Sequence, residues 1–194
     1  MMDKKMKIIL AVVAVIIIAI LGVFLFLSNS DVTLSGLDSQ VTLPNNYTLD
    51  DKGVATLGDV GIYYTGIQGG DTNSVDDFYK ALKSNGKDSG YQNITTDKIN
   101  GFKVYEFAAN PKELKNVSSD REYSGNQYSW TEYPPYIPYK GMTDMDVDHF
   151  RYIGFINPNT KTLSELTIFT NNSDVNLYSK DIDAIINSIA PIAE

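Results

Sequence analysis

The sequence predicts an α+β protein, an antiparallel β-sheet flanked by helices, preceded by one N-terminal transmembrane helix. Three patterns support this prediction. Residues Ile8–Leu27 form an uninterrupted apolar run. Further along the chain, short runs rich in β-branched and aromatic residues are bounded by Gly and Asn, as strands are. Two other segments have apolar residues at helical spacing. Because the strands come as hairpins, with the helices between and after them, we expect an antiparallel sheet with helices packed on it.

The apolar run Ile8–Leu27 has the length of a membrane-spanning helix. Its 20 residues cover about 30 Å as a helix, the thickness of the hydrocarbon core. Three lysines lie in the preceding tail, residues 1–7, and the next basic residue is Lys52. Basic flanks stay in the cytoplasm. We therefore expect a single-pass protein of the cell membrane, held in the lipid bilayer by Ile8–Leu27, with a cytoplasmic N-terminus and an extracytoplasmic C-terminal domain.

The alternative to this signal anchor is a cleaved secretory signal peptide. Signal peptides have apolar regions of about 7–15 residues and a cleavage site with small residues. The run here is longer, and Phe26 occupies a position where such a site needs a small residue. The chain also has no cysteine, which excludes a lipidated cysteine as the anchor. We favour the uncleaved helix.

The rest of the chain divides into a polar spacer, residues 28–37, and one domain, residues 38–194. Residues 31–194 carry 13 basic and 23 acidic side chains, a net charge of −10. This charge repels nucleic acid and anionic lipid surfaces. A domain of this length can bury a core without disulfides. No motif in it predicts a cofactor.

The first half of the domain shows three strand candidates and one helix. The strand candidates are Gln40–Leu43, Val54–Leu57 and Ile62–Ile67. Ser74 can cap a following helix, which Asn85-Gly86 ends. The apolar stripe of this helix contains Val75, Phe78, Tyr79 and Leu82.

The second half shows two hairpins and a last helix. Ile94–Ile99 and Phe102–Phe107 flank Asn100-Gly101, a pair that favours a two-residue type I′ turn. Both faces of this hairpin carry large apolar residues, so we expect it to be covered on both sides. The second hairpin pairs Phe150–Ile156 with Leu163–Thr170. Ser179 or Asp181 can cap the last helix, which has apolar residues Ile182, Ile185, Ile186 and Ile189 and is followed by Pro191.

This order of elements resembles a known family. A first strand that ends in Leu43-Pro44, the Ile99–Phe102 turn with Tyr105 and Phe107, and the closing helix Ile182–Ile189 are similar to PsbP-type domains. These are α/β/α sandwiches first known from the oxygen-evolving complex of photosystem II, with membrane-tethered relatives in bacteria and archaea. The resemblance covers residues 38–192. It implies a sandwich fold and an accessory or binding role, and it places no catalytic residue in this chain.

Residues 121–148 form an insertion rich in tyrosine and proline. Pro134, Pro135 and Pro138 favour extended backbone. Exposed Tyr and Trp rings stack on sugars and on protein partners, and long loops inside compact domains are often functional. We therefore consider five aromatic residues of this segment as candidate binding residues: Tyr128, Trp130, Tyr133, Tyr136 and Tyr139. The alternative is that the segment folds over the sheet and its rings close the core.

The insertion also carries a candidate cation site. Asp144, Asp146 and Asp148 alternate along the chain, but an EF-hand starting at Asp144 would need Gly and Glu where the sequence has His149 and Phe155. The alternation is typical of a strand that enters the Phe150–Ile156 hairpin. The three aspartates stay as candidate ligands for a cation site of another kind. The chain has one histidine, so the sequence predicts neither a histidine zinc cluster nor a Ser-His-Asp triad.

These observations favour a non-catalytic binding or accessory module. Its partner would be a protein or a cell-envelope glycan, bound through the Tyr/Pro-rich insertion. The alternative is a structural or assembly subunit whose outer domain docks on a membrane complex. A hydrolase is a more distant alternative, because no pair of nucleophile and base can be nominated from the sequence.

Overall fold

The computed structural model of the protein describes residues 31–67, 72–119, 122–124, 127–129 and 131–192. The predicted membrane span Ile8–Leu27 lies outside these residues, as does Trp130. Among the described residues, no helix is long and apolar enough to cross a membrane.

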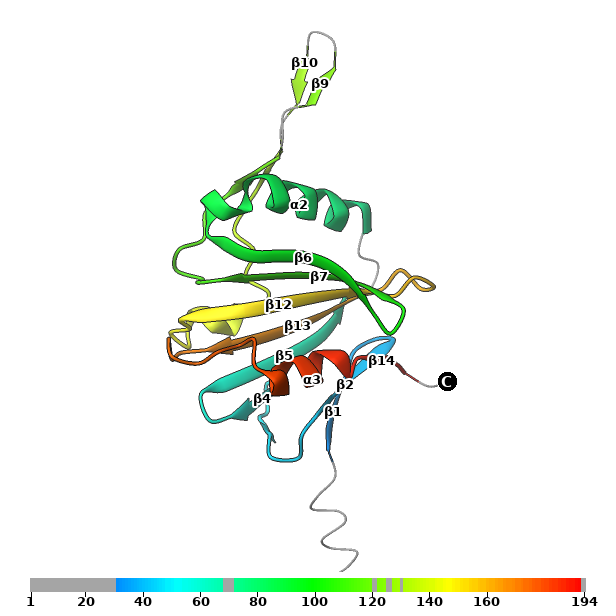
Figure 1. Cartoon of the computed structure of the whole chain (residues 1–194), viewed down its shortest axis with the longest axis vertical. Helices are drawn as coiled ribbons and strands as arrows, with labels where there is room; N and C mark the ends of the chain where they lie inside the picture. Colours follow the sequence, from blue (N-terminus) through cyan, green and yellow to red (C-terminus); the bar gives the residue numbers. More distant parts are fainter. Residues whose placement is uncertain (1–30, 68–71, 120–121, 125–126, 130, 193–194) are drawn as a thin grey trace, which may run out of the picture.

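The centre of the domain is a seven-stranded sheet in which all neighbouring strands are antiparallel (Figure 1). Its strand order is β3-β4-β5-β13-β12-β7-β6. The strands are β3 (Thr48–Leu49), β4 (Val54–Leu57), β5 (Val60–Ile67), β6 (Tyr91–Ile99), β7 (Phe102–Ala109), β12 (His149–Ile156) and β13 (Leu163–Thr170). The predicted antiparallel α+β class is therefore confirmed, and both predicted hairpins, β6–β7 and β12–β13, form.

Elements pack on both faces of this sheet. On one face lie α3 (Lys180–Asn187) and a three-stranded sheet in the order β1-β2-β14. The three strands are β1 (Val32–Ser35), β2 (Ser39–Leu43) and β14 (Ala190–Pro191). On the other face lie α2 (Thr72–Asn85), the short 3-10 helices η1 (Gly86–Ser89) and η2 (Lys140–Thr143), and the part of the Tyr/Pro-rich segment from Tyr133 to Tyr139. Two separate clusters of buried side chains fill the two sides of the sheet.

The turn between β6 and β7 shows how local sequence fixes the fold. Asn100 and Gly101 have φ of 49° and 88°, and Ile99 pairs with Phe102, as a two-residue primed turn requires. The predicted turn is confirmed. The Asn100 side chain also donates from Nδ2 to the carbonyl oxygens of Asn187 (3.1 Å) and Ile189 (2.7 Å). This residue therefore connects the hairpin to the carboxyl end of α3.

Three local expectations differ from the structure. Strand β1 lies within the predicted spacer, because Leu34 alternates with polar neighbours and is buried against the sheet. Helix α2 begins at Thr72, so Ser74 lies inside the helix and is not its cap. The sequence predicts that the last helix extends to Ile189, but α3 ends at Asn187, and Ala190–Pro191 form β14, which pairs with β2. For α3 the prediction of Ser179 as the cap is confirmed, since its side chain accepts the N–H of Ile182.

Candidate functional site

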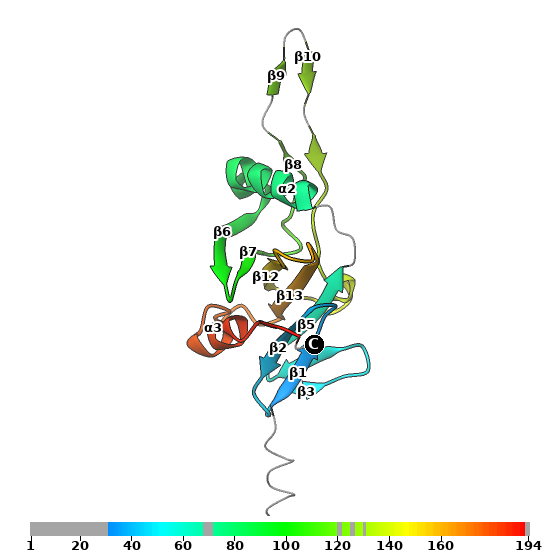
Figure 2. The ribbon, with the colours of Figure 1, turned by 90° about the vertical axis from the view of Figure 1, so that its right-hand side faces the viewer.

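The Tyr/Pro-rich segment divides into a projecting hairpin and a packed stretch. Strands β8 (Val117–Ser118) and β11 (Glu132–Tyr133) pair at the base of the hairpin. Beyond them the short strands β9 (Glu122–Ser124) and β10 (Gln127–Ser129) pair only with each other in the described part of the chain. Figures 1 and 2 show β9–β10 projecting beyond α2, at the end of the molecule opposite β1.

The base of this hairpin is closed by hydrogen bonds between two facing residues. The N–H of Ser119 donates to the carbonyl oxygen of Thr131 at 2.7 Å, and the N–H of Thr131 donates to Oγ of Ser119 at 2.7 Å. The projecting part of the hairpin therefore begins beyond Ser119 and Thr131. In the hairpin itself the register places Tyr123 opposite Tyr128.

Three of the predicted binding tyrosines lie in the packed stretch. The ring of Tyr139 stacks on Tyr63, with the ring centres 4.4 Å apart. Tyr133 meets the ring of Phe78 edge-on at 5.4 Å. Tyr136 contacts several rings of the sheet and of α2, and its centre is 5.6 Å from that of Tyr152. For Tyr133, Tyr136 and Tyr139 the structure therefore favours the alternative in which the rings close the core.

Tyr136 is the best anchored of the three. Its hydroxyl donates to a carboxylate oxygen of Glu165, and its backbone N–H donates to the hydroxyl of Tyr91 at 2.9 Å. Glu165 is buried and also accepts the hydroxyl of Tyr152 at 2.8 Å. Burial raises the pKa of Glu165, and the hydrogen bonds from the two phenols oppose this shift. The Tyr/Pro-rich segment is thus attached to the sheet through a buried carboxylate.

A glycine at the end of the segment allows the close approach of Tyr139. A Cβ on Gly141 would lie 2.4 Å from Cζ of Tyr139, well inside van der Waals contact. A side chain on Gly141 would therefore displace the ring of Tyr139 from its position over the start of η2.

The three candidate aspartates do not gather. Asp146 pairs with Lys112 at 2.6 Å, and this hydrogen bond lowers the pKa of the Asp146 carboxyl. Asp148 pairs with Nδ1 of His149 at 2.9 Å. No group of three potential metal ligands is found among the described residues. The predicted strand over Asp144–Asp148 is also wrong, because η2 and a turn precede β12, and Asp146 has a φ of 52°.

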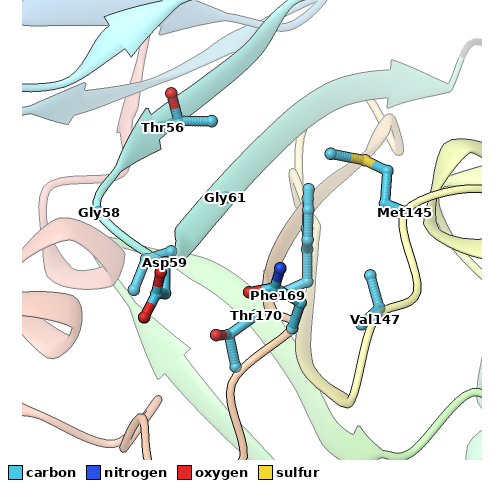
Figure 3. Close-up of a pocket in the computed structure, with 10 residues that line it drawn as sticks. Thr56, Gly58, Asp59, Gly61, Met145, Val147, Phe169 and Thr170 are labelled. Atoms are coloured by element: carbon cyan, nitrogen blue, oxygen red, sulfur yellow. The ribbon is translucent and has the colours of Figure 1, made fainter.

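One small hollow lies between the β4–β5 turn and residues 145–147 (Figure 3). Its volume is about 160 Å³, and Met145, Val147 and Phe169 form its apolar wall. Asp59, the charged residue that lines it, accepts the side-chain N–H of Asn172 at 2.8 Å. This hollow is smaller than most ligand sites and offers no group for catalysis.

Two buried charged residues were missed in the sequence. Glu165 and Arg151 each lie in a strand whose other residues are uncharged. A charged residue inside such a run signals a buried polar contact, because an unpaired charge would be too costly there. This signal could have identified both residues, although it does not reveal their partners.

Comparison with known proteins does not indicate a function for this chain. The chain matches no model of a protein family, no curated protein and no solved structure.

Proposed function

We propose that the protein is a membrane-anchored, extracytoplasmic, non-catalytic binding module that takes a protein partner through the hairpin β9–β10. One observation carries this proposal. The hairpin stands at one end of the long axis of the molecule, and β1 lies at the other end (Figures 1 and 2). The chain from the predicted membrane span Ile8–Leu27 enters the domain at β1.

The short connection between the predicted membrane span and β1 also favours this orientation of the domain. Four residues, 28–31, separate the predicted span from β1, and they reach at most about 14 Å. A domain on so short a connection stays close to the membrane surface at its β1 end. The hairpin at the far end would then point away from the membrane, where a partner can approach it.

The form of the hairpin favours a protein over a glycan as its partner. Neither β9 nor β10 pairs with a third strand in the described part of the chain, so each offers backbone groups to an incoming strand. Tyrosines such as Tyr123 and Tyr128 are common in protein interfaces. A glycan platform of five aligned rings has less support, since three of the five predicted residues pack on the sheet.

The fold supports the same class of function. A sheet with helices over both faces is the arrangement that a PsbP-type sandwich would have, and that resemblance implies an accessory role. The alternative is an assembly subunit of a membrane complex. It is favoured by the short connection, which would hold the domain beside any neighbouring membrane protein.

Removal of the hairpin tests the proposal. Because Ser119 and Thr131 already face each other, replacement of residues 120–130 by Asn-Gly should close the base with a two-residue turn. We expect the thermal unfolding of the domain to stay nearly unchanged, and we expect loss of the partners that crosslink to the intact protein in whole cells. The measurement is affinity purification of the tagged full chain after crosslinking.

A matched control removes exposed apolar surface elsewhere. Leu49 and Leu57 are 49% and 39% exposed, and the variant with both changed to Ser should retain every partner. If the hairpin-excised chain captures the same partners in the same yield, the hairpin is not the binding surface.

A further inference from the structure

A groove of about 330 Å³ opens beside the start of β6, the end of β7 and the loop that precedes α3. A β-bulge lies at its edge, where the register of β6 and β7 shifts between Gln92 and Thr95. At the bulge Asn93 has a φ of 50°, a left-handed conformation that non-glycine residues seldom adopt. Bulges bend a strand locally and are frequent next to binding sites.

The charged floor of the groove is held rigidly. Arg151 is 6% exposed, and its Nε donates to Glu106 at 2.8 Å while Nη1 donates to Asp183 at 2.7 Å. The ring of Tyr178 covers the guanidinium at 4.2 Å. One guanidinium faces two carboxylates, so the floor is rigid and carries a net negative charge, which disfavours an anionic ligand.

The histidine at the groove is also fixed. Nδ1 of His149 lies 2.9 Å from a carboxylate oxygen of Asp148, and Nε2 lies 3.0 Å from the carbonyl oxygen of Val175. Both ring nitrogens are therefore used within the protein, and His149 is not placed to act as a catalytic base.

Other polar groups around the groove have hydrogen-bond donors or acceptors that a ligand could use. The Oδ1 atoms of Asn110 and Asn176 each accept a backbone N–H at 2.9 Å. Their Nδ2 atoms make no hydrogen bond to any residue that the structure describes. The same holds for the side chains of Gln92 and Glu113, which are exposed at the rim. The groove thus offers both donors and acceptors.

We propose that this groove binds a neutral sugar residue. Each sugar hydroxyl both donates and accepts hydrogen bonds, so amide donors beside the Glu113 carboxylate suit it. Tyr178 is 37% exposed and provides an aromatic surface beside these polar groups. Acidic Glu113 and Asp148 disfavour an anionic ligand. The volume falls at the lower end of the range of small-ligand pockets, about 300–1,000 Å³.

Saturation-transfer NMR on the full chain in a sugar-free detergent tests this site. The probes are glucose, mannose, galactose and N-acetylglucosamine, each titrated separately. We expect at least one to bind saturably. Glu113→Gln and Tyr178→Leu should each weaken its binding about tenfold, the effect of one lost polar or stacking contact.

Matched variants show whether the sugar binds in the groove itself. Glu132→Gln changes an exposed carboxylate outside the groove, so this variant should retain the affinity. The hairpin-excised chain should also bind the sugar, which makes this test independent of the proposed partner site. The sugar assignment is wrong if none of the four probes binds, or if Glu113→Gln and Tyr178→Leu bind the sugar as the intact chain does.

Discussion

Replacement of Tyr136 by Ala is expected to lower the free energy of unfolding by about 3–5 kcal/mol, the usual cost of emptying a packed aromatic site. Tyr136 packs against the rings of Phe107 and Tyr152 and is half-buried. Its loss would also take one hydrogen-bond donor from the buried Glu165. Chemical denaturation of the full chain, followed by circular dichroism, measures the change.

The variant Tyr136→Phe separates packing from hydrogen bonding. It keeps the ring and removes only the hydroxyl that donates to the Glu165 carboxylate, so we expect a loss of about 1.5–3 kcal/mol, the range for a hydrogen bond to a charged group. If Tyr136→Ala changes stability by less than about 0.5 kcal/mol, as inert surface substitutions do, the segment is not packed on the sheet. The ring would then be available for binding after all.

Replacement of Arg151 by Met is expected to have an effect of similar size. The guanidinium lies between Glu106 and Asp183 and also donates to the carbonyl oxygen of Leu177 at 3.0 Å. Without it the carboxylate of Glu106, itself largely buried, loses its charged partner. Removal of one member of a buried ion pair costs about 3–5 kcal/mol. The same denaturation experiment measures this loss.

An exposed ion pair provides the matched control. Lys103 and Asp76 approach to 2.6 Å, but their side chains are 47% and 39% exposed. Exposed pairs of this kind contribute about 0–1 kcal/mol, so Lys103→Met should change stability little. If Arg151→Met lowers the free energy of unfolding no more than Lys103→Met does, the connection between β12 and α3 does not depend on Arg151.

The sequence predicts the structure best where a few neighbouring residues allow only one local backbone conformation. Asn100-Gly101 between two apolar runs leads to a two-residue turn, and the structure has it. Ser179 before an apolar stripe leads to a capped helix. Strand β1 was missed because Leu34 is a single buried residue among polar neighbours, and its burial depends on distant parts of the sheet.

The candidate site shows that the composition of a segment does not predict which of its aromatic residues pack on the sheet. Six aromatic residues among prolines look alike in the sequence, yet Tyr136 and Tyr139 lie against the sheet while Tyr123 belongs to a projecting strand. What separates them is a partner far along the chain, such as Glu165 for Tyr136. No local pattern near residue 136 predicts that contact.

Thiol-specific crosslinking in intact cells tests the central claim most directly. The chain has no cysteine, so Ser124→Cys in β9 and Thr48→Cys in β3 each introduce one unique thiol. With a membrane-impermeant, photoactivatable maleimide, the proposed extracytoplasmic location predicts that both positions are labelled. The proposed partner site predicts protein adducts from position 124 alone. Absence of labelling at both positions would contradict the outside location. Equal adducts from both positions would contradict a partner site at the hairpin.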